Sequence, residues 1–531
     1  MADKPKSTSG AAPGIAKVST LAFVGMTCAL CVSIRNIPDV ASTGWTMFFY
    51  MLVATLLFGF PISLIAGEFT TTFPGAGGPE LWDTKSLSPR WGFVTSWLLW
   101  VQMFPGMVMV ASVLAPLVGY AIGNVALGMN NVFTLVCILV VYWAVTLLNM
   151  RFDMAKIGGK IGIWLGLYIP IVAMFILGLA AVIKTGGFSA GSTLGTFSGA
   201  KLVPDGVDWS SLTMFSTIIF IFTGIEMSSV YVERLQKPDK QYPIGVFISL
   251  LLMFVFNVAN AFLVAAVVPK GQMQLNNITQ AVAIYVDVLG LPHWFVNAFA
   301  ILVFLGVVVQ LSGWVSGPSQ TITASARRGE YPSGWKFWKT NKFGLSTRVL
   351  IVQAVIISVF ALVYLLIPAV NTAFLMLVNA TSVLYCIVYV LMAIGIMRLR
   401  KTQPTLARPF RIGKTGNGLC YFIAIVLLAV IVLVNGLVYA TSSVANNIVV
   451  TIVSIVLFVI PLFIFAHKKP AWETDVRHAL LQQGVNLAED GTIDGVTAGE
   501  HAKNPDPVEK AKADAKDQKV IDMHKNMHTA A

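Results

Sequence analysis

The sequence predicts an all-α membrane protein with about 12 transmembrane helices in a five-plus-five inverted repeat. Of its 531 residues, 56% are hydrophobic and only 11% are charged, whereas about 25% of the residues of a soluble protein are charged. The mean hydropathy is +0.77. Hydrophobic runs recur along the chain, and the first and the sixth are interrupted by polar or helix-breaking residues. Length, composition and the two interruptions together give the fold class.

About twelve runs reach the ~20 residues that a helix needs to cross a bilayer. They lie near residues 18–42, 46–67, 93–122, 132–150, 158–183, 211–232, 244–268, 292–320, 348–368, 372–397, 417–440 and 447–466.

The first run contains a polar stretch at what should be the middle of the bilayer. Ser33, Arg35 and Asn36 precede Pro38 there. Proline lacks an N–H and disfavours helical geometry in the residue before it, so we expect the helix to break at 33–38. A break in lipid is tolerated only where the freed backbone groups line a cavity or bind something. Arg35 costs about 2.5–3.5 kcal/mol at that depth and therefore indicates a partner or a function.

A second interruption lies in the sixth run, five spans after the first. Gly224 is flanked by Thr223 and Ser228, and Glu226 is at mid-depth. Interrupted helices at matching positions of two halves are typical of inverted-repeat transporters, whose substrate site lies at the midplane.

The chain divides into parts that follow from these spans. We expect an N-terminal segment at 1–16, repeat one at 17–184, an extracellular loop at 185–210, repeat two at 211–398, two further helices at 399–466 and a tail at 467–531. The tail is polar and poor in aromatic residues, so we expect it to be largely disordered, with a short helix possible around 473–483. It carries five of the six histidines, which fit either a pH-sensitive plug or a solvated tail.

Lysines and arginines are concentrated in alternate loops, including 85–90, 151–160, 234–240, 327–348 and 398–414. This bias predicts that both termini are cytoplasmic. It also explains the net charge of +12 without nucleic acid as a partner; the bilayer is the surrounding phase.

Helix ends at a break expose N–H groups that suit a carboxylate and carbonyl groups that suit an ammonium. Two facing breaks can therefore hold an amino acid better than a sugar. Hydroxyls of Ser33 and Thr223 can add contacts or pack small side chains. Glu226 is either a proton carrier or half of an ion pair with Arg35.

Two further pairs have i, i+4 spacing, which places each pair on one helix face. Gln310 and Trp314 form the first pair, in which the tryptophan can cap a cavity. Tyr385 and Tyr389 form the second, and their hydroxyls need partners when buried.

Signatures of other functions are missing from the sequence. It has no Walker A motif and no histidine that lies clearly inside a predicted span, so we expect neither an enzyme nor an ATP-driven pump, and no cofactor or metal. Cys28 and Cys31 have redox spacing, but they lie on a membrane helix without a preceding strand, and we interpret them as packing residues.

Several motifs, in the right order over residues 18–466, resemble those of the amino acid–polyamine–organocation (APC) superfamily. They are the run 67–82, Gly224-Ile225-Glu226 with 237–243, then 326–332 and 408–412. Within the superfamily, the runs 88–93 and 310–318 and the tyrosine pair are most similar to the glutamate/γ-aminobutyrate antiporter family.

The resemblance implies a LeuT-type fold of twelve helices with alternating access, in a bacterial plasma (inner) membrane. It implies a substrate site on helices one, three, six, eight and ten. Carried over, that site comprises Ser33, Ile34, Arg35, Asn36, Thr223, Gly224, Ile225, Met227, Gln310, Trp314, Tyr385 and Tyr389, with Glu226 and Lys160 in proton coupling or gating.

This chain departs from the family at two positions. Arg35-Asn36-Ile37-Pro38 replaces a Tyr-Glu-Tyr-Pro pattern, and Gln310 replaces an acid that is often present on helix eight. Both changes make the site more positive and disfavour cationic substrates. We therefore expect a secondary transporter, most simply an antiporter that exchanges a neutral or acidic amino acid for a small-molecule counter-substrate. A proton-coupled symporter on the same fold and a non-transporting sensor or scaffold are the alternatives.

Overall fold

The computed structural model describes residues 18–481 except 33, 75–77, 153, 155–163, 188–190, 205–212, 342, 368, 414–415 and 442. Ser33, Lys160 and the tail beyond residue 481 lie outside the described residues. The described part is helical throughout, as predicted, apart from loops and two isolated β-bridges.

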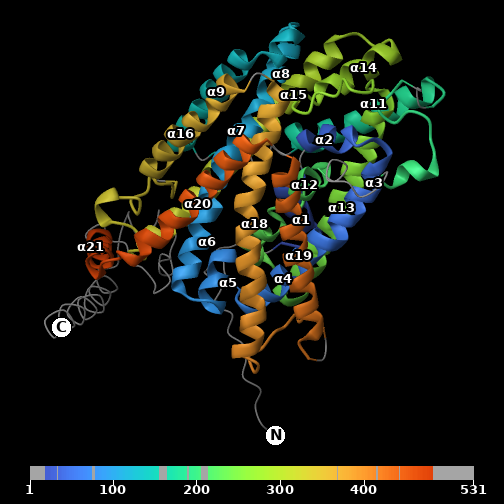
Figure 1. The fold of residues 1–531 in the computed structure, drawn as a ribbon. Helices are drawn as coiled ribbons and strands as arrows, with labels where there is room; N and C mark the ends of the chain where they lie inside the picture. Colours follow the sequence, from blue (N-terminus) through green and yellow to red (C-terminus); the bar gives the residue numbers. More distant parts are fainter. Residues whose placement is uncertain are drawn as a thin grey trace, which may run out of the picture.

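Nine helices of the described residues are long and apolar enough to cross a membrane. Together with α20 and the two interrupted segments, they account for the twelve predicted runs (Figure 1). The helices are α1 (Thr20–Cys31), α2 (Ile37–Ser42), α3 (Met47–Ala54), α4 (Phe60–Thr72), α5 (Pro79–Ser86), α6 (Pro89–Val101), α7 (Met103–Ser112), α8 (Leu114–Ala121), α9 (Asn131–Arg151), α11 (Ile169–Lys184), α12 (Thr213–Phe220), α13 (Pro238–Val267), α14 (Thr279–Leu289), α15 (Trp294–Arg327), α16 (Thr347–Ala361), α17 (Val363–Leu366), α18 (Val370–Thr402), α19 (Gly418–Thr441), α20 (Val444–Ala466) and α21 (Pro470–Leu481).

Short 3-10 and π segments join or extend these helices. They are η1 (Ile34–Asn36), η2 (Gly44–Thr46), η3 (Thr55–Gly59), η4 (Val125–Met129), η6 (Trp164–Tyr168), η7 (Gly199–Leu202), η8 (Ile225–Arg234) and η9 (Ser333–Trp335).

The first membrane segment is broken, but the break lies at the start of the expected range. α1 ends at Cys31, Val32 adopts an extended conformation with ψ 127°, and η1 and α2 resume the helix. Pro38 does not interrupt the backbone; it lies in the first turn of α2. A proline is tolerated there because the N–H groups of a first helical turn have no intrahelical partner.

The sixth segment is broken at a glycine. α12 ends at Phe220, and η8 begins at Ile225 after a four-residue turn. Gly224 has φ +91°, a left-handed conformation that other residues rarely adopt. The chain before α1 pairs with the end of η8, where the Val18 N–H donates to the Arg234 carbonyl at 2.8 Å. The two broken segments are therefore joined to each other at this end.

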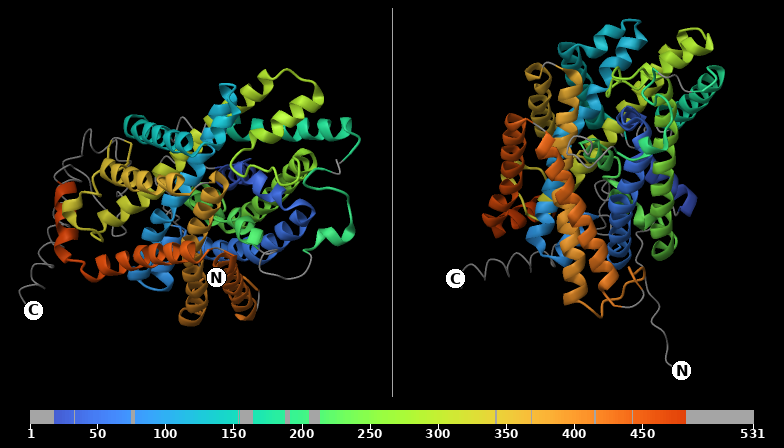
Figure 2. Two further views of the ribbon diagram at one scale, coloured as in Figure 1. Left: turned by 45° about the horizontal axis from the view of Figure 1, so that its top comes forward. Right: turned by 45° about the vertical axis from the view of Figure 1, so that its right-hand side comes forward.

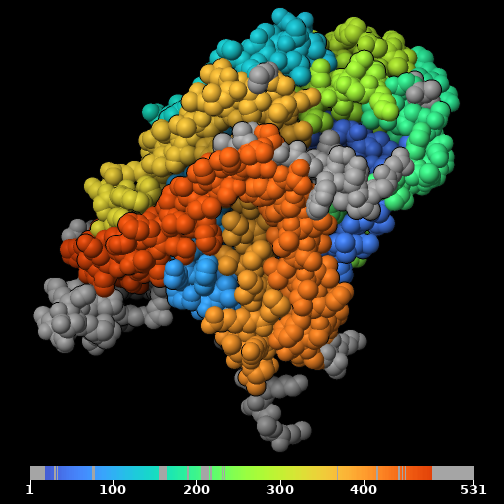
Figure 3. Space-filling view, viewed as in Figure 1, coloured from blue at the N-terminus to red at the C-terminus, as the bar shows by residue number. Residues whose placement is uncertain are grey.

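The remaining helices surround the broken segments. α1, α2 and α4 pack along α13, and the views of Figure 2 show the blue N-terminal helices beside the green α13. On the other side α18 packs against α5, α6, α7 and α12, while α15 packs against α7, α8 and α9. α20 runs across α6 and α18 on the face shown in Figure 3. Large apolar side chains remain exposed on the outer helices, including Val140, Ile176, Val359 and Phe463, as a lipid-facing surface requires.

A buried ion cluster fixes one end of α4. Glu68 is 0% exposed and accepts hydrogen bonds from Arg400 of α18 and from the Ile412 N–H. Arg408 lies 3.3 Å from the same carboxylate. The cluster ties α4 to the α18–α19 loop without contributing to the cavity described below.

The end of the described chain folds back on the loop after α15. α21 follows α20 at a bend of 82°, and its Val476 and Leu480 are buried. The Ser333 hydroxyl donates to Asp475 at 2.8 Å. The structure therefore has a docked helix where the sequence suggested that a short helix was possible.

Candidate functional site

A cavity lies between the two breaks and helices α7, α15 and α18. Its lining comprises Cys31, Arg35, Asn36, Gln102, Met103, Gly106, Met109, Val110, Phe220, Ile221, Thr223, Gln310, Trp314, Thr381 and Tyr385.

Arg35 carries the only formal charge among the described residues that line this cavity. The side chain is 8% exposed, and its Nη1 lies 3.6 Å from the Met109 sulfur of α7. Asp39, four residues later on α2, interacts electrostatically with the guanidinium from behind the lining. A positive group in a small enclosed space attracts a carboxylate and repels a cation.

The left-handed glycine of the second break is fastened to α18 by a hydrogen-bond network. The Gly224 N–H donates to the Tyr389 hydroxyl at 2.9 Å. Tyr389 in turn donates to Glu226 at 2.9 Å, and Tyr385 donates to the other oxygen of that carboxylate at 2.6 Å. The two rings are stacked, with centroids 5.0 Å apart. Both oxygens of Glu226 are thus held by tyrosine hydroxyls, and its side chain is 0% exposed.

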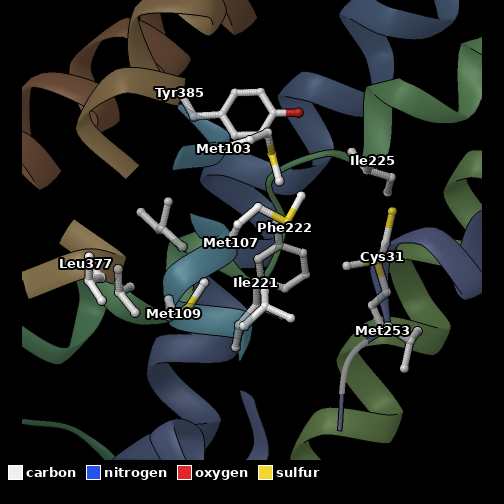
Figure 4. Close-up of a cluster of buried hydrophobic side chains, with 14 of the residues drawn as sticks. Cys31, Met103, Met107, Met109, Ile221, Phe222, Ile225, Met253, Leu377 and Tyr385 are labelled. Carbon is white, nitrogen blue, oxygen red and sulfur yellow. The ribbon is translucent and has the colours of Figure 1, made fainter. Parts of the chain in front are cut away.

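Beside the neutral polar side chains, the wall of the cavity is apolar and rich in sulfur. Figure 4 shows Cys31 of α1 and Met103 and Met107 of α7 in one buried cluster, with Ile221 of the second break nearby. Of these four, Met107 does not line the cavity. Such a wall accommodates an aliphatic substrate portion of variable shape, because methionine side chains are flexible and polarizable.

Six of the residues predicted from the sequence line the cavity together: Arg35, Asn36, Thr223, Gln310, Trp314 and Tyr385. The remaining described ones lie outside the lining. Gly224 is adjacent, since a Cβ there would be 3.7 Å from both Trp314 and the Tyr385 hydroxyl. Tyr389, Ile34 and Ile225 are buried, and Met227 is partly buried.

One of the two roles considered for Glu226 was an ion pair with Arg35, and the structure bears on it directly. Among the ion pairs of the described residues, none joins Arg35 to Glu226. The carboxylate faces the tyrosines of α18 instead. The ion pair considered from the sequence is therefore wrong for this conformation, because hydroxyl donors from a distant helix occupy the carboxylate.

Several lining residues were not singled out from the sequence. Gln102 lies between α6 and α7, is 2% exposed, and has a carbonyl oxygen without a hydrogen-bond partner in the described part of the chain. The sequence feature that could have identified Gln102 is a polar amide side chain within a hydrophobic run. Thr381 precedes Tyr385 by one turn on the same face of α18, so helical spacing alone could have added it. Met103 and Met109 gave no signal, because apolar residues are the rule in such a helix.

Metal-binding chemistry is not indicated in the part of the chain that the structure describes. No group of three or more His, Cys, Asp or Glu side chains is placed to hold an ion there. All five cysteines are buried and free of disulfides.

Comparison with known proteins gives a consistent match over the membrane domain. The family model described as amino acid permease matches residues 18–460. An uncharacterized transporter of Legionella pneumophila is 28% identical over 386 residues, which cover 72% of this chain and 80% of that protein. A glutamate/gamma-aminobutyrate antiporter of Lactococcus lactis is 26% identical over 418 residues, covering 75% and 80%. A probable agmatine/putrescine antiporter of Lactococcus lactis is 26% identical over 465 residues, covering 84% and 94%.

Proposed function

Because this chain belongs to the amino acid permease family, and so is a membrane transporter and not an enzyme, we propose that it exchanges neutral or acidic amino acids by alternating access. The observation that carries the proposal is the charge of the cavity. Among the described residues that line it, Arg35 supplies a guanidinium and all the others are neutral polar or apolar.

The relatives differ in the charge of the substrates that their names give, from glutamate to agmatine and putrescine. No carboxylate is among the described residues that line the cavity. The buried guanidinium of Arg35 therefore disfavours a diamine by like-charge repulsion in a low-dielectric site. It favours the α-carboxylate of an amino acid, which can accept two parallel hydrogen bonds from a guanidinium. Carbonyl groups freed at the breaks then suit the α-ammonium. This supports an amino acid and argues against a polyamine.

Broken helices support movement as well as binding. Unwound segments at the centre of two membrane helices allow each half to tilt about the substrate. Gly224 supplies the hinge geometry at the second break, and its N–H donates to Tyr389 of α18 in the present conformation. We place both termini on the cytoplasmic side of the plasma membrane, in accordance with the distribution of basic loops.

A thermal-shift screen of the purified protein tests the substrate class. Glutamate, glutamine, leucine and γ-aminobutyrate are compared with agmatine and putrescine. A ligand that binds the folded state raises its apparent stability by mass action, so we expect amino acids to stabilise and the two amines to have no effect. Stabilisation by the amines alone would contradict the proposal.

Counterflow in proteoliposomes tests exchange. Uptake of labelled substrate should require unlabelled amino acid inside the vesicles, whereas a symporter would respond to a proton gradient alone. Arg35→Ala should abolish uptake while the protein still inserts, and Arg348→Ala, an exposed arginine at the start of α16, should retain it. Failure of every amino acid to bind or move would favour a sensor or scaffold.

A further inference from the structure

Asp39 is a second buried acid near the cavity, and no role assigned so far uses it. It lies on α2, four residues beyond Arg35, and is 4% exposed. Its Oδ1 is buried without a hydrogen-bond partner among the described residues. Glu226, by contrast, has both oxygens bound by tyrosine hydroxyls. Of the two acids, Asp39 is therefore the one with an oxygen free to bind a proton.

Arg35 is the charged group that faces Asp39. α2 packs against η1, α3, α12 and α13. The titratable groups on these elements are Arg35 on η1, Tyr50 on α3, and Asp239, Lys240 and Tyr242 in the first turns of α13; the described part of α12 has none. Among these groups, the Arg35 guanidinium is the one that interacts electrostatically with the Asp39 carboxyl. The acid and the cavity charge are thus neighbours, with Arg35 on the cavity side.

We propose that Asp39 takes up a proton from water when the substrate carboxylate docks on Arg35, so that substrate and proton bind together. The inference rests on the proposed function. Two carboxylates beside one guanidinium in a dry site repel each other, and a proton on one of them removes the repulsion. The step is Asp39–COO⁻ plus H⁺ from the aqueous phase to Asp39–COOH. For an amino acid of net charge −1, such as glutamate, the net charge of the site is the same before and after binding.

The consequence is a linkage between pH and affinity. If one proton is taken up per substrate, the dissociation constant falls by up to about tenfold for each unit by which the pH is lowered, over the range in which empty Asp39 is ionised. An exchanger of this kind would carry a proton with each anionic amino acid. A static Arg35–Asp39 ion pair would instead bind substrate with no proton exchange.

Isothermal titration calorimetry of the full-length protein in detergent tests this directly. L-glutamate and L-glutamine are titrated at about pH 8 in Tris and in phosphate, which differ in ionisation enthalpy. The difference in heat gives the number of protons taken up per substrate. We expect uptake in the wild type, none in Asp39→Asn, and wild-type uptake in Asp287→Asn, which removes an exposed acid on α14.

The affinity is then followed from about pH 9 to about pH 6. It should rise by up to tenfold per unit in the wild type over the range in which empty Asp39 is ionised and level off at lower pH, and it should stay within twofold in Asp39→Asn. If Asp39→Asn does not fold, Asp39→Ser and the acid-retaining Asp39→Glu replace it, with uptake expected only in the latter. Binding without proton uptake in the wild type, or uptake that persists without an acid at position 39, overturns the inference and leaves the proposed function intact. No binding of either amino acid overturns both.

Discussion

The hydroxyl of Tyr389 donates to the Glu226 carboxylate at 2.9 Å, across 163 residues of sequence. The same hydroxyl accepts the Gly224 N–H. One tyrosine thus satisfies the Gly224 N–H at the second break and one oxygen of the Glu226 carboxylate, and it ties the second break to α18.

Replacement of Tyr389 by Phe should destabilise this conformation and slow transport. It removes the acceptor of the Gly224 N–H and one donor to the buried Glu226 carboxylate, at about 1–3 kcal/mol each. Thermal unfolding and uptake rates measure both effects. Tyr285→Phe is the matched control, because Tyr285 is also 0% exposed but its hydroxyl has no partner among the described residues. Equal unfolding temperatures for the two variants would contradict this prediction.

Replacement of Glu68 by Gln should be among the most destabilising changes outside the cavity. It removes the charge between Arg400 and Arg408 and leaves two buried cations uncompensated. Breaking a buried ion pair from one side costs about 3–5 kcal/mol. Glu473→Gln breaks the more exposed pair with Arg477 on α21, and there we expect a loss of less than about 1 kcal/mol. Denaturation of the purified variants gives the loss in free energy of unfolding for each. A loss for Glu68→Gln no larger than that for Glu473→Gln would contradict the prediction.

Gly306 of α15 should not tolerate alanine. A Cβ at this position would overlap the backbone of Gly166 in η6, and a Cβ on Gly166 would overlap Gly306 in return. The helices cross here with backbone against backbone, so any side chain separates them. Gly317→Ala on the same helix meets nothing within 4 Å and controls for helix propensity. Expression, monodispersity and unfolding temperature should fall for Gly306→Ala alone; equal behaviour of the two variants would show that the crossing can open.

Stability should fall with rising pH because of Asp83 on α5, outside the spanning helices. Burial raises the pKa of its carboxyl to about 8, although Thr95 donates to it at 2.5 Å. The folded protein keeps a proton that the unfolded chain releases above its ordinary pKa near 3.8. The stabilisation is thus complete below about pH 4 and is lost as the pH rises to about 8, by at most about 1.4 kcal/mol per unit.

Unfolding temperatures between about pH 5 and pH 9 measure this slope. Asp83→Asn should flatten it, because the amide can still accept from Thr95 and carries no charge. Asp239→Asn, at an exposed position on α13, should leave it as in the wild type. An unchanged slope in Asp83→Asn would assign the pH dependence to another group.

Much of the fold was predictable because its causes are local. Length and hydropathy of a run identify a spanning helix without reference to any partner. The breaks were predictable for the same reason: Gly224 permits a left-handed residue, and polar residues around Arg35 are too costly for a continuous lipid-facing helix. The error at Pro38 is instructive, because proline fits either a break or a first helical turn, and only the conformation of Val32 distinguishes them.

The sequence by itself determined which segments cross the membrane, where two of them are interrupted, and that an arginine and a glutamate are buried near those interruptions. Only the tertiary structure decided the partners of those two charges. The Glu226 carboxylate accepts hydrogen bonds from two tyrosines of α18. Arg35 lines the cavity, and Asp39 interacts electrostatically with it from outside the lining. Hydropathy and helix breaking depend on neighbours in sequence, whereas a buried charge is stabilised by whatever groups packing brings within a few ångströms of it, and no local pattern encodes which groups those are.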